Sequence, residues 1–190
     1  AGQPLLMLDT TRTLAEREIL QGRLYNQQAA VDRLQAERDN LPEVAFSSVL
    51  VDASSLDSRA LSAISSEQAL FAARSADRRA EEAVLVSQRK GLELVMGSRQ
   101  AVEASLQQEI TDLRELLEEG YVDKQRLREL ERARTQTLGE LADLEVSIEE
   151  TGLRISQLQT RFKREVVDVL AVTLEDLYDI KQQFAAAEDK

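Results

Sequence analysis

The sequence has no histidine, no cysteine and no tryptophan, and only 4% of its 190 residues are aromatic. Without histidine and cysteine, the chain lacks the commonest general base, the commonest metal ligand and any thiol nucleophile. The absence of cysteine also excludes disulfide bonds and Cys-based zinc sites. Because large rings usually dominate a thick globular core, the few aromatics indicate a narrow core built from aliphatic side chains.

Sequence motifs that would indicate catalysis are missing as well. The chain has no Gly-rich phosphate loop and no Gly-x-Ser-x-Gly elbow. Adjacent carboxylates such as Glu118 and Glu119 are expected on exposed helix faces or at a turn, with no cleft around them. We therefore expect no catalytic residues, no cofactor and no metal site, and the protein is not expected to be an enzyme. No apolar run approaches the ~18–20 residues that a membrane span requires.

The charge and composition indicate a long helical protein. Acidic residues outnumber basic ones by 35 to 24, which gives a net charge of −11. This balance disfavours general binding to nucleic acid or anionic lipid, because both rely on Lys and Arg to neutralise phosphate. Only seven glycines and two prolines occur, and Ala, Glu, Leu, Arg and Gln dominate. Such usage is typical of long helices and coiled coils.

The stretch LLEEGYVDKQRL contains a strong signal for the end of a helix. Gly120 suits the left-handed conformation that follows a helix C-terminus. Tyr121 would then contact Leu116 one turn back, which is the apolar contact of a Schellman ending.

The same stretch contains a signal for the start of another helix. Asp123 can cap it through its carboxylate, and Val122 and Leu127 have the spacing of a hydrophobic staple. About sixty residues of helical pattern lie on each side, so the sequence predicts a sharp reversal between two long helices.

These signals predict an all-α fold, a long antiparallel coiled-coil helical hairpin with a shorter third helix packed at its base. A short lipoyl-like strand is expected at the N-terminus. In chain order we expect a partial lipoyl-like segment 1–8 and a helical hairpin domain 9–190. The hairpin domain would comprise a helix over about 9–40, an extended connector 41–57 with a brief strand, a helix over about 58–119, a turn 120–123 and a helix over about 124–187.

Rows of apolar or neutral residues mark the faces on which the two long helices pair. In the last helix one row contains Leu127, Arg134, Leu141, Ile148, Ile155, Phe162 and Val169, and a second contains Leu130, Thr137, Leu144, Thr151, Leu158 and Val172. From Val166 the stripe moves to Leu170, Thr173, Leu177, Ile180 and Phe184, as expected when a helix drifts from a strict seven-residue repeat. The expected stripe of the preceding helix is Leu92, Val95, Val102, Leu106, Ile110, Leu113 and Leu117.

A turn centred near residue 121 pairs positions whose numbers add to about 243. The facing pairs would then be Leu127 with Leu116, Leu130 with Leu113, Leu141 with Val102, and Ile148 with Val95. Arg134 would face Glu109 as a polar layer that sets the register. In the alternative, Arg134 only extends its guanidinium to water.

The end of the hairpin is the candidate binding site, because an exposed aromatic at a tip is a plausible docking contact. The residues that we expect to bind a partner are Leu116, Leu117, Gly120, Tyr121, Val122, Asp123, Lys124, Arg126 and Leu127. In the alternative, Tyr121 only completes the helix ending and Val122 only staples the next helix.

Four stretches of the chain resemble a known family. AGQPLLMLDTTR looks like the first half of a lipoyl-type domain leading into a helix, and LRELLEEGYVDKQRLRELER looks like a hairpin tip. SSEQALFAAR and RFKREVVDVL are similar to the same branch. On these residues, nearly the whole chain resembles the haemolysin D-like (HlyD-like) periplasmic adaptor, or membrane fusion, proteins of type I secretion.

The resemblance implies a hairpin that interrupts a split lipoyl domain, whose second half would follow Lys190. It implies a periplasmic location, with anchoring in the inner membrane by a segment outside this chain. The implied partners are an inner-membrane ABC transporter, an outer-membrane channel of the TolC type that the tip would meet, and further copies of the chain in a ring or tube, expected to be a hexamer. The Arg-x3-Leu-x6-Ser pattern of related efflux adaptors would fall on Asp112, Leu116 and Asp123, so only the leucine is kept.

Two other classes of protein also use long coiled coils. One is a cytoplasmic coiled-coil scaffold or tether, against which the lipoyl-like start argues. The other is a coiled-coil arm attached to an enzyme, and no nucleotide-binding motif in the chain supports it.

Overall fold

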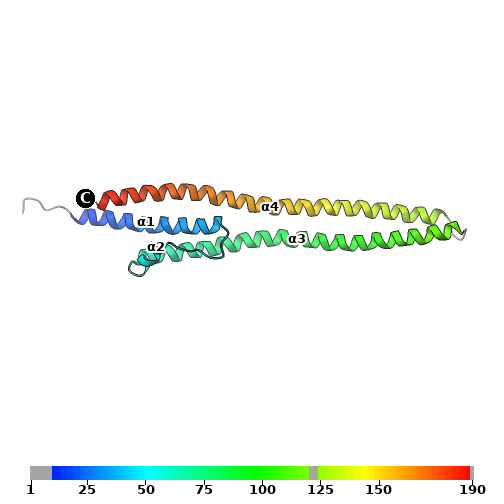
Figure 1. Ribbon diagram of the computed structural model, residues 1–190, viewed down its shortest axis with the longest axis horizontal. Coiled ribbons are helices and arrows are strands. Elements are labelled where there is room, and N and C mark those ends of the chain that lie inside the picture. Colours follow the sequence, from blue (N-terminus) through cyan, green and yellow to red (C-terminus); the bar gives the residue numbers. More distant parts are fainter. Residues whose placement is uncertain (1–9, 120–123, 189–190) are drawn as a thin grey trace, which may run out of the picture. The chain divides into compact units, whose positions relative to one another are not determined.

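The computed structural model describes residues 10–119 and 124–188, and almost all of these residues are helical (Figure 1). The helices are α1 (Thr10–Arg38), α2 (Ser48–Ser54), α3 (Ser58–Glu118) and α4 (Lys124–Glu188). No strand occurs in the described ranges, which confirms the prediction of an all-α fold. The lipoyl-like strand predicted over 1–8 lies outside them.

Two compact units make up the fold. The first contains α1, α2, the start of α3 through Arg78 and the part of α4 from Thr160 onward. The second extends from Arg79 to Gln159 and contains the remainder of α3 and α4. Helices α3 and α4 each belong to both units, so the chain enters the second unit through one and leaves it through the other.

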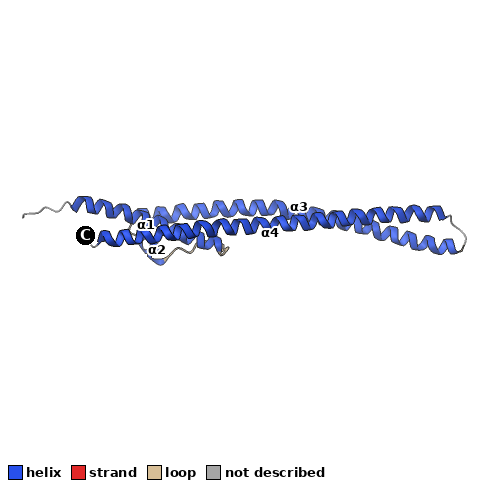
Figure 2. Ribbon diagram, turned by 90° about the horizontal axis from the view of Figure 1, so that it is seen from above, coloured by secondary structure: helices blue, strands red, loops and turns tan. Residues whose placement is uncertain are grey.

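In the first unit, α1 packs between α4 on one side and α2 with α3 on the other (Figures 1 and 2). Val31 and Leu34 of α1 form a buried cluster with Val166, Leu170 and Leu177 of α4. Ala29 of α1 forms a second cluster with Leu50, Ala60 and Ala63 of α2 and α3. The short helix packed on the long pair is therefore present as predicted.

Polar contacts give the direction of α1 relative to α3. Glu18 lies beside Arg59, Arg33 pairs with Glu67, and Asn40 accepts a 2.6 Å hydrogen bond from Arg78. Residue numbers rise together along both helices, so α1 and α3 are parallel. Gln27 donates to the Thr173 carbonyl oxygen at 3.2 Å and thereby joins α1 to α4.

Helix α1 ends in a Schellman motif at Asn40. Asn40 has φ of 54°, the left-handed conformation that asparagine tolerates better than most residues. The Leu41 N–H donates to the Ala36 carbonyl oxygen at 2.9 Å, and the Asn40 N–H donates to that of Glu37 at 3.2 Å. Leu41 is 43% exposed. Leu41 therefore lies outside the two buried clusters of the first unit.

The prediction of an extended connector with a brief strand was wrong, because α2 occupies its centre. Leu50 is only 1% exposed, whereas Val49 and Val51 are 76% and 48% exposed. The buried Asp32 carboxylate accepts the Ser47 N–H at 2.8 Å, immediately before α2 begins. A seven-residue helix has too few turns to show helical periodicity in the sequence, and its position depends on α1 and α3.

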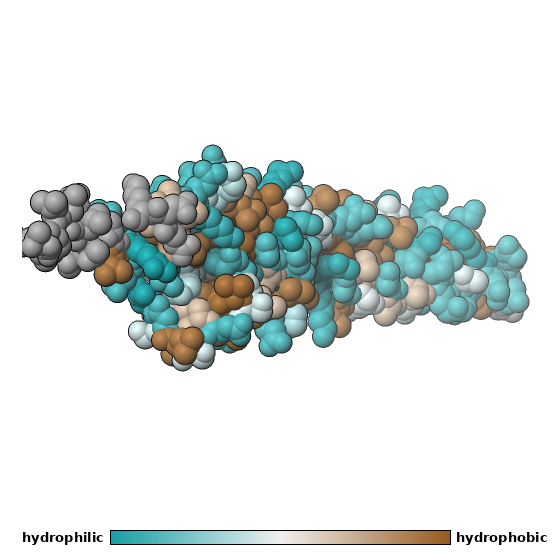
Figure 3. Space-filling view, turned by 60° about the vertical axis from the view of Figure 1, so that its left-hand side comes forward, coloured by the Kyte–Doolittle hydropathy of each residue, from teal (hydrophilic) through white to brown (hydrophobic). Residues whose placement is uncertain are grey.

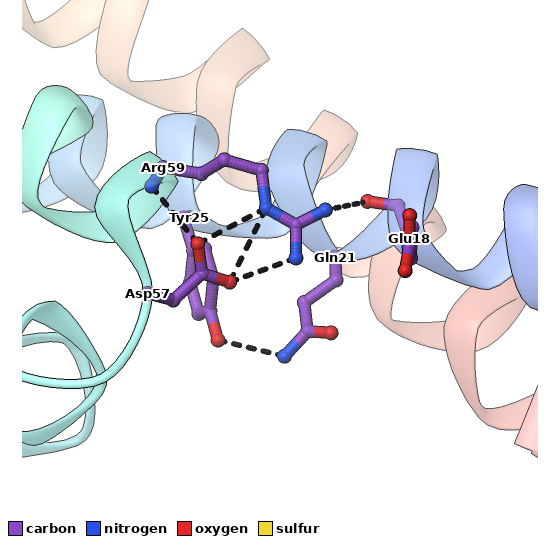
Figure 4. A network of polar contacts seen from close by, with 5 residues as sticks. All are labelled: Glu18, Gln21, Tyr25, Asp57 and Arg59. Carbon is purple, nitrogen blue, oxygen red and sulfur yellow. Dashed lines mark hydrogen bonds and ion pairs between the residues drawn. The ribbon is translucent and has the colours of Figure 1, made fainter.

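Helix α3 begins at Ser58, with Asp57 as its cap (Figure 4). The Asp57 carboxylate accepts the Arg59 backbone N–H at 2.9 Å and the Arg59 Nη2 at 2.8 Å. Nη1 of the same guanidinium donates to the Glu18 carbonyl oxygen at 2.7 Å. Further along α3, the Ser65 hydroxyl donates to the Ser62 carbonyl oxygen.

The predicted change of stripe in α4 is confirmed. Val166, Leu170 and Leu177 are buried, with 1%, 5% and 5% of their surface exposed. Val169 and Val172, which would continue the earlier rows, are 50% and 60% exposed. The extra spacing of four after Phe162 realigns the helix with a straight 3.6-residue period, so α4 presents its apolar face to α1.

In the second unit α3 and α4 run antiparallel. Hydrogen bonds and ion pairs join Glu82 with Gln159, Arg99 with Glu140, Glu103 with Arg134, and Arg114 with Glu131. The numbers of each pair add to about 240, near the predicted value. The inward positions of α4 are those predicted for both rows between Leu127 and Leu158.

The inward face of α3 differs from the prediction in two places. Val95 and Val102 are 49% and 43% exposed, while Met96 and Glu103, the next residues along, are the half-buried ones. The pairs Leu141 with Val102 and Ile148 with Val95 are therefore wrong. The alternating three-and-four spacing that continues back from Ile110 selects Met96 and Glu103, although valine is the more apolar choice at the neighbouring position.

Candidate docking site at the end of the helix pair

The candidate site comprises the last turns of α3 and the first turns of α4. Leu116 is 42% exposed, and Leu117 and Leu127 are half-buried. Lys124 and Arg126 are exposed at the start of α4. The other predicted residues of the site, Gly120, Tyr121, Val122 and Asp123, lie outside the described residues. So do the predicted contacts of Tyr121 with Leu116 and of Val122 with Leu127.

Two buried apolar residues lie in the seam behind these residues. Ile110 and Leu130 are 2% and 7% exposed, the lowest values among the described apolar residues of the second unit. Leu113, half-buried, lies one turn further along α3. Leu117, the next residue of this row, is also half-buried, whereas Leu116 beside it is exposed.

An ion pair joins α3 and α4 beside the buried Ile110 and Leu130. Arg114 Nη2 lies 2.7 Å from Glu131 Oε1, and both side chains are about half exposed. Sequence reasoning missed this pair. The signal for this pair was that Arg114 and Glu131 have opposite charges and flank the seam. Arg114 directly follows the predicted inward residue Leu113 on α3, and Glu131 directly follows Leu130 on α4.

Acidic residues predominate at the end of α3, and basic residues predominate at the start of α4. The exposed residues of α3 near its end include Asp112, Glu115, Glu118 and Glu119. The exposed residues of α4 near its start include Lys124, Arg126, Arg128 and Arg132. The last turn of α3 has no basic residue and the first turn of α4 has no acidic one. This layout opposes both helix dipoles, which favour cations at C-termini and anions at N-termini, and so costs some helix stability.

The predicted polar layer at Arg134 exists, with a different partner. Arg134 Nε donates to Glu103 Oε1 at 2.7 Å, and the Glu103 side chain is 20% exposed. Glu109, the predicted partner, is exposed. The cause is the spacing of α3, because Glu103 occupies an inward position and Glu109 does not. The Arg134 side chain is 37% exposed, so it also reaches water.

Groups of ionisable side chains that could hold a metal ion are absent from the described ranges 10–119 and 124–188. Within those same ranges no helix is apolar enough over a sufficient length to cross a membrane.

The model of a known family aligns with almost the entire chain. The family is described as AprE, long alpha-helical hairpin, and its match covers residues 13–190. The chain belongs to this family. The AprE hairpin match includes both long helices and the turn between them, so the predicted helical hairpin is confirmed. A search of curated proteins finds no match.

A solved structure agrees with the AprE hairpin assignment. The chain is similar to the soluble domain of LipC, described as a membrane fusion protein of a type I secretion system, with 25% sequence identity and a TM-score of 0.67. The alignment covers 98% of this chain and 94% of the other. The resemblance to membrane fusion proteins of type I secretion is thus confirmed by both comparisons.

Proposed function

We propose that this chain is the helical part of a periplasmic adaptor in type I protein secretion. The adaptor would link an inner-membrane ABC transporter to an outer-membrane channel of the TolC type. The proposal depends above all on the similarity to LipC, a membrane fusion protein of such a system, over 98% of the chain. The AprE hairpin match over residues 13–190 supports the same role.

The mechanism that this role requires is geometric and involves no catalysis. Two helices of 61 and 65 residues form the arms of the hairpin. Copies of the chain would associate side by side, expected as a hexamer, and enclose the path of the secreted protein. The protein would act in the periplasm, anchored in the inner membrane by a segment outside this chain.

Docking on the channel would use the candidate site at the hairpin tip, whose residues are those given above. The accessible Leu116 supplies an apolar contact, and the exposed Lys124 and Arg126 supply positive charge beside it. An apolar contact surrounded by charged groups is the usual composition of a protein–protein contact.

The test is Leu116→Asp in the whole adaptor within a reconstituted secretion system. A carboxylate at this position leaves no apolar surface to bury against the channel, and a buried unpaired charge is strongly unfavourable. We expect secretion to fall at least tenfold, while the circular dichroism spectrum and the amount of membrane-bound adaptor stay unchanged.

Leu61→Asp is the matched control. Leu61 is 55% exposed on α3 in the first unit, far along the helix from Leu116. It tests whether any exposed leucine tolerates a carboxylate, and secretion should stay near the parental level. Normal secretion by the Leu116→Asp protein would rule out tip docking through this residue.

A further inference from the structure

Positive charge is concentrated on one ridge at the start of α4. Lys124, Arg128 and Arg132 follow one another at intervals of four residues, so their side chains form a single row along the helix surface. All three are exposed, and they line one shallow hollow together with Gln125 and Glu129. We call these three cations the α4 basic ridge. The ridge extends about 12 Å along the helix from its first to its last residue.

The α4 basic ridge is not neutralised within the described ranges. No ion pair or hydrogen bond joins its three cations to another described residue. The two carboxylates of this stretch have other partners, because Glu129 lies 3.5 Å from Arg126 and Glu131 lies 2.7 Å from Arg114. The ridge therefore presents its full positive charge to the surroundings.

This placement of charge opposes the stability of α4. Like charges four residues apart on a helix repel each other, and cations at a helix N-terminus oppose the helix dipole. The ridge has two such intervals and begins at Lys124, the first residue of α4. The chain has only 24 basic residues against 35 acidic ones, yet three of them stand together where they favour folding least. Folding alone does not account for the ridge.

The acidic end of α3 limits what can bind to the ridge. Glu115, Glu118 and Glu119 are exposed there. An extended anionic surface, such as a layer of lipid headgroups or a polynucleotide, would meet these carboxylates as well as the ridge, and like charges repel. A narrow acidic segment can follow the ridge and avoid them. An α-helix with acidic residues four positions apart presents its carboxylates at the spacing of the ridge.

Exposed apolar side chains do not by themselves distinguish this end of the helix pair. Leu116 is 42% exposed on α3. Apolar side chains also occur, interspersed with polar ones, on the face of the first unit that Figure 3 shows. The uncompensated charge of the α4 basic ridge is what sets the tip apart.

We infer that the α4 basic ridge binds an acidic helical segment of the channel, which lies along the side of α4 as far as Arg132. This inference rests on the proposed function and deepens it, because it gives the chemistry of the channel surface and the extent of the contact. A contact confined to the end of the hairpin would leave Arg132 unused, since it lies about two turns beyond Lys124. A contact along α4 lets each cation pair with one carboxylate.

The test replaces the ridge with uncharged residues, Lys124→Gln/Arg128→Gln/Arg132→Gln, in the whole adaptor. The amount of channel that co-purifies with the adaptor and the amount of secreted protein are both measured. We expect both to fall roughly tenfold, as for the loss of three exposed ion pairs of modest strength.

Thermal unfolding of the chain with the same three changes gives a second readout. Its melting temperature should rise, because the repulsion within the ridge and the conflict with the helix dipole are removed. Weaker binding at higher stability separates a role in binding from a role in folding. An unchanged or lower melting temperature would contradict the argument that the ridge exists at the expense of folding.

Arg79→Gln/Lys90→Gln/Arg154→Gln is the matched control. These three cations are also exposed and lie away from the start of α4, so the net charge changes by the same amount. Co-purification and secretion should stay near the parental level. An equal loss in this control would overturn the inference, because net charge and not the ridge would then control binding.

Arg132→Gln alone tests how far the contact extends. If the channel segment lies along α4, this single change should lower co-purification severalfold. Parental binding by Arg132→Gln, together with weaker binding by Lys124→Gln, would restrict the contact to the end of the hairpin and overturn the inference.

The remaining outcomes separate this inference from its rivals. Parental co-purification by the triple ridge variant would refute it. So would ridge-dependent binding to phosphatidylglycerol vesicles, or a loss of self-association with the channel still bound. Loss of secretion by Leu116→Asp with normal secretion by the triple ridge variant would keep the proposed function and refute the ridge. Normal secretion by both would refute tip docking itself.

Discussion

At the residue scale, buried charges in the first unit are paired across helices. Arg33 donates to Glu67 on α3 and, at 2.6 Å, to Glu37 on its own helix. The Arg33 pKa is raised: burial lowers it, and the hydrogen bonds and charges of Glu67 and Glu37 outweigh that effect. Removing one member of such a buried set leaves the others uncompensated. These pairs therefore specify how α1 sits on α3.

Asp57 allows a test of pH dependence. Hydrogen bonds from the Arg59 side chain and backbone hold the pKa of Asp57 below its ordinary value of 3.8. A carboxylate whose pKa is lower in the folded state stabilises the fold at pH values above its unfolded-state pKa. That contribution is lost as the pH falls through the folded-state pKa. We expect Asp57→Asn to lower the melting temperature at pH 7 and the difference to shrink below pH 3.8. Asparagine also caps helices, so the ion pair is the main loss.

Asp77→Asn serves as the control for this measurement. Asp77 is exposed inside α3 and lies at no helix end. Thermal unfolding followed by circular dichroism at several pH values compares the two variants. A destabilisation by Asp57→Asn that is the same at pH 7 and at low pH would contradict the assigned role of its charge.

At the element scale, glycines weaken the long helices of the second unit. Gly91 in α3 and Gly152 in α4 lie inside helices, and a Cβ built on either meets no atom within 4 Å. Alanine at such positions removes the entropy cost of glycine, about 0.5–1 kcal/mol at each site. We expect Gly91→Ala/Gly152→Ala to raise the free energy of unfolding by about 1–2 kcal/mol in urea titrations.

The reverse substitution checks the size of this effect. Ala142 is exposed inside α4, and Ala142→Gly should lower the free energy of unfolding by about 0.5–1 kcal/mol. A loss of stability in the double alanine variant would mean that the glycines serve a bend or a close contact that single chains do not show.

At the scale of the whole molecule, the two units differ in how much they bury. The first has two buried clusters contributed by all four helices. In the second, Ile110 and Leu130 are the only described apolar residues that are buried. Regions with few buried contacts open at lower free energy. We therefore expect amides around Leu141 to exchange with deuterium faster than those around Leu34, as measured by native-state exchange and mass spectrometry. Equal protection would show that both units open together.

Prediction from the sequence succeeded where the repeat was long. The rows of α4, including their displacement at Val166, are visible because each turn adds another residue to the pattern. Prediction failed at α2, whose seven residues bury only Leu50, and at Val95 and Val102, where apolar character conflicted with the spacing. For the candidate site, Leu116, Lys124 and Arg126 are exposed, and their predicted role in binding stays a prediction. It did not identify the Arg114–Glu131 pair, which requires knowledge of the partner helix.

The sequence by itself determined that this protein is two long helices with a reversal between them, because helix formation and heptad periodicity depend on residues a few positions apart. Only the tertiary structure decided that α1 runs parallel to α3, that Asp32 holds the start of α2, and that Arg134 pairs with Glu103. Those contacts join residues from 15 to 41 positions apart. Their geometry depends on how helices pack in space, which no local pattern contains.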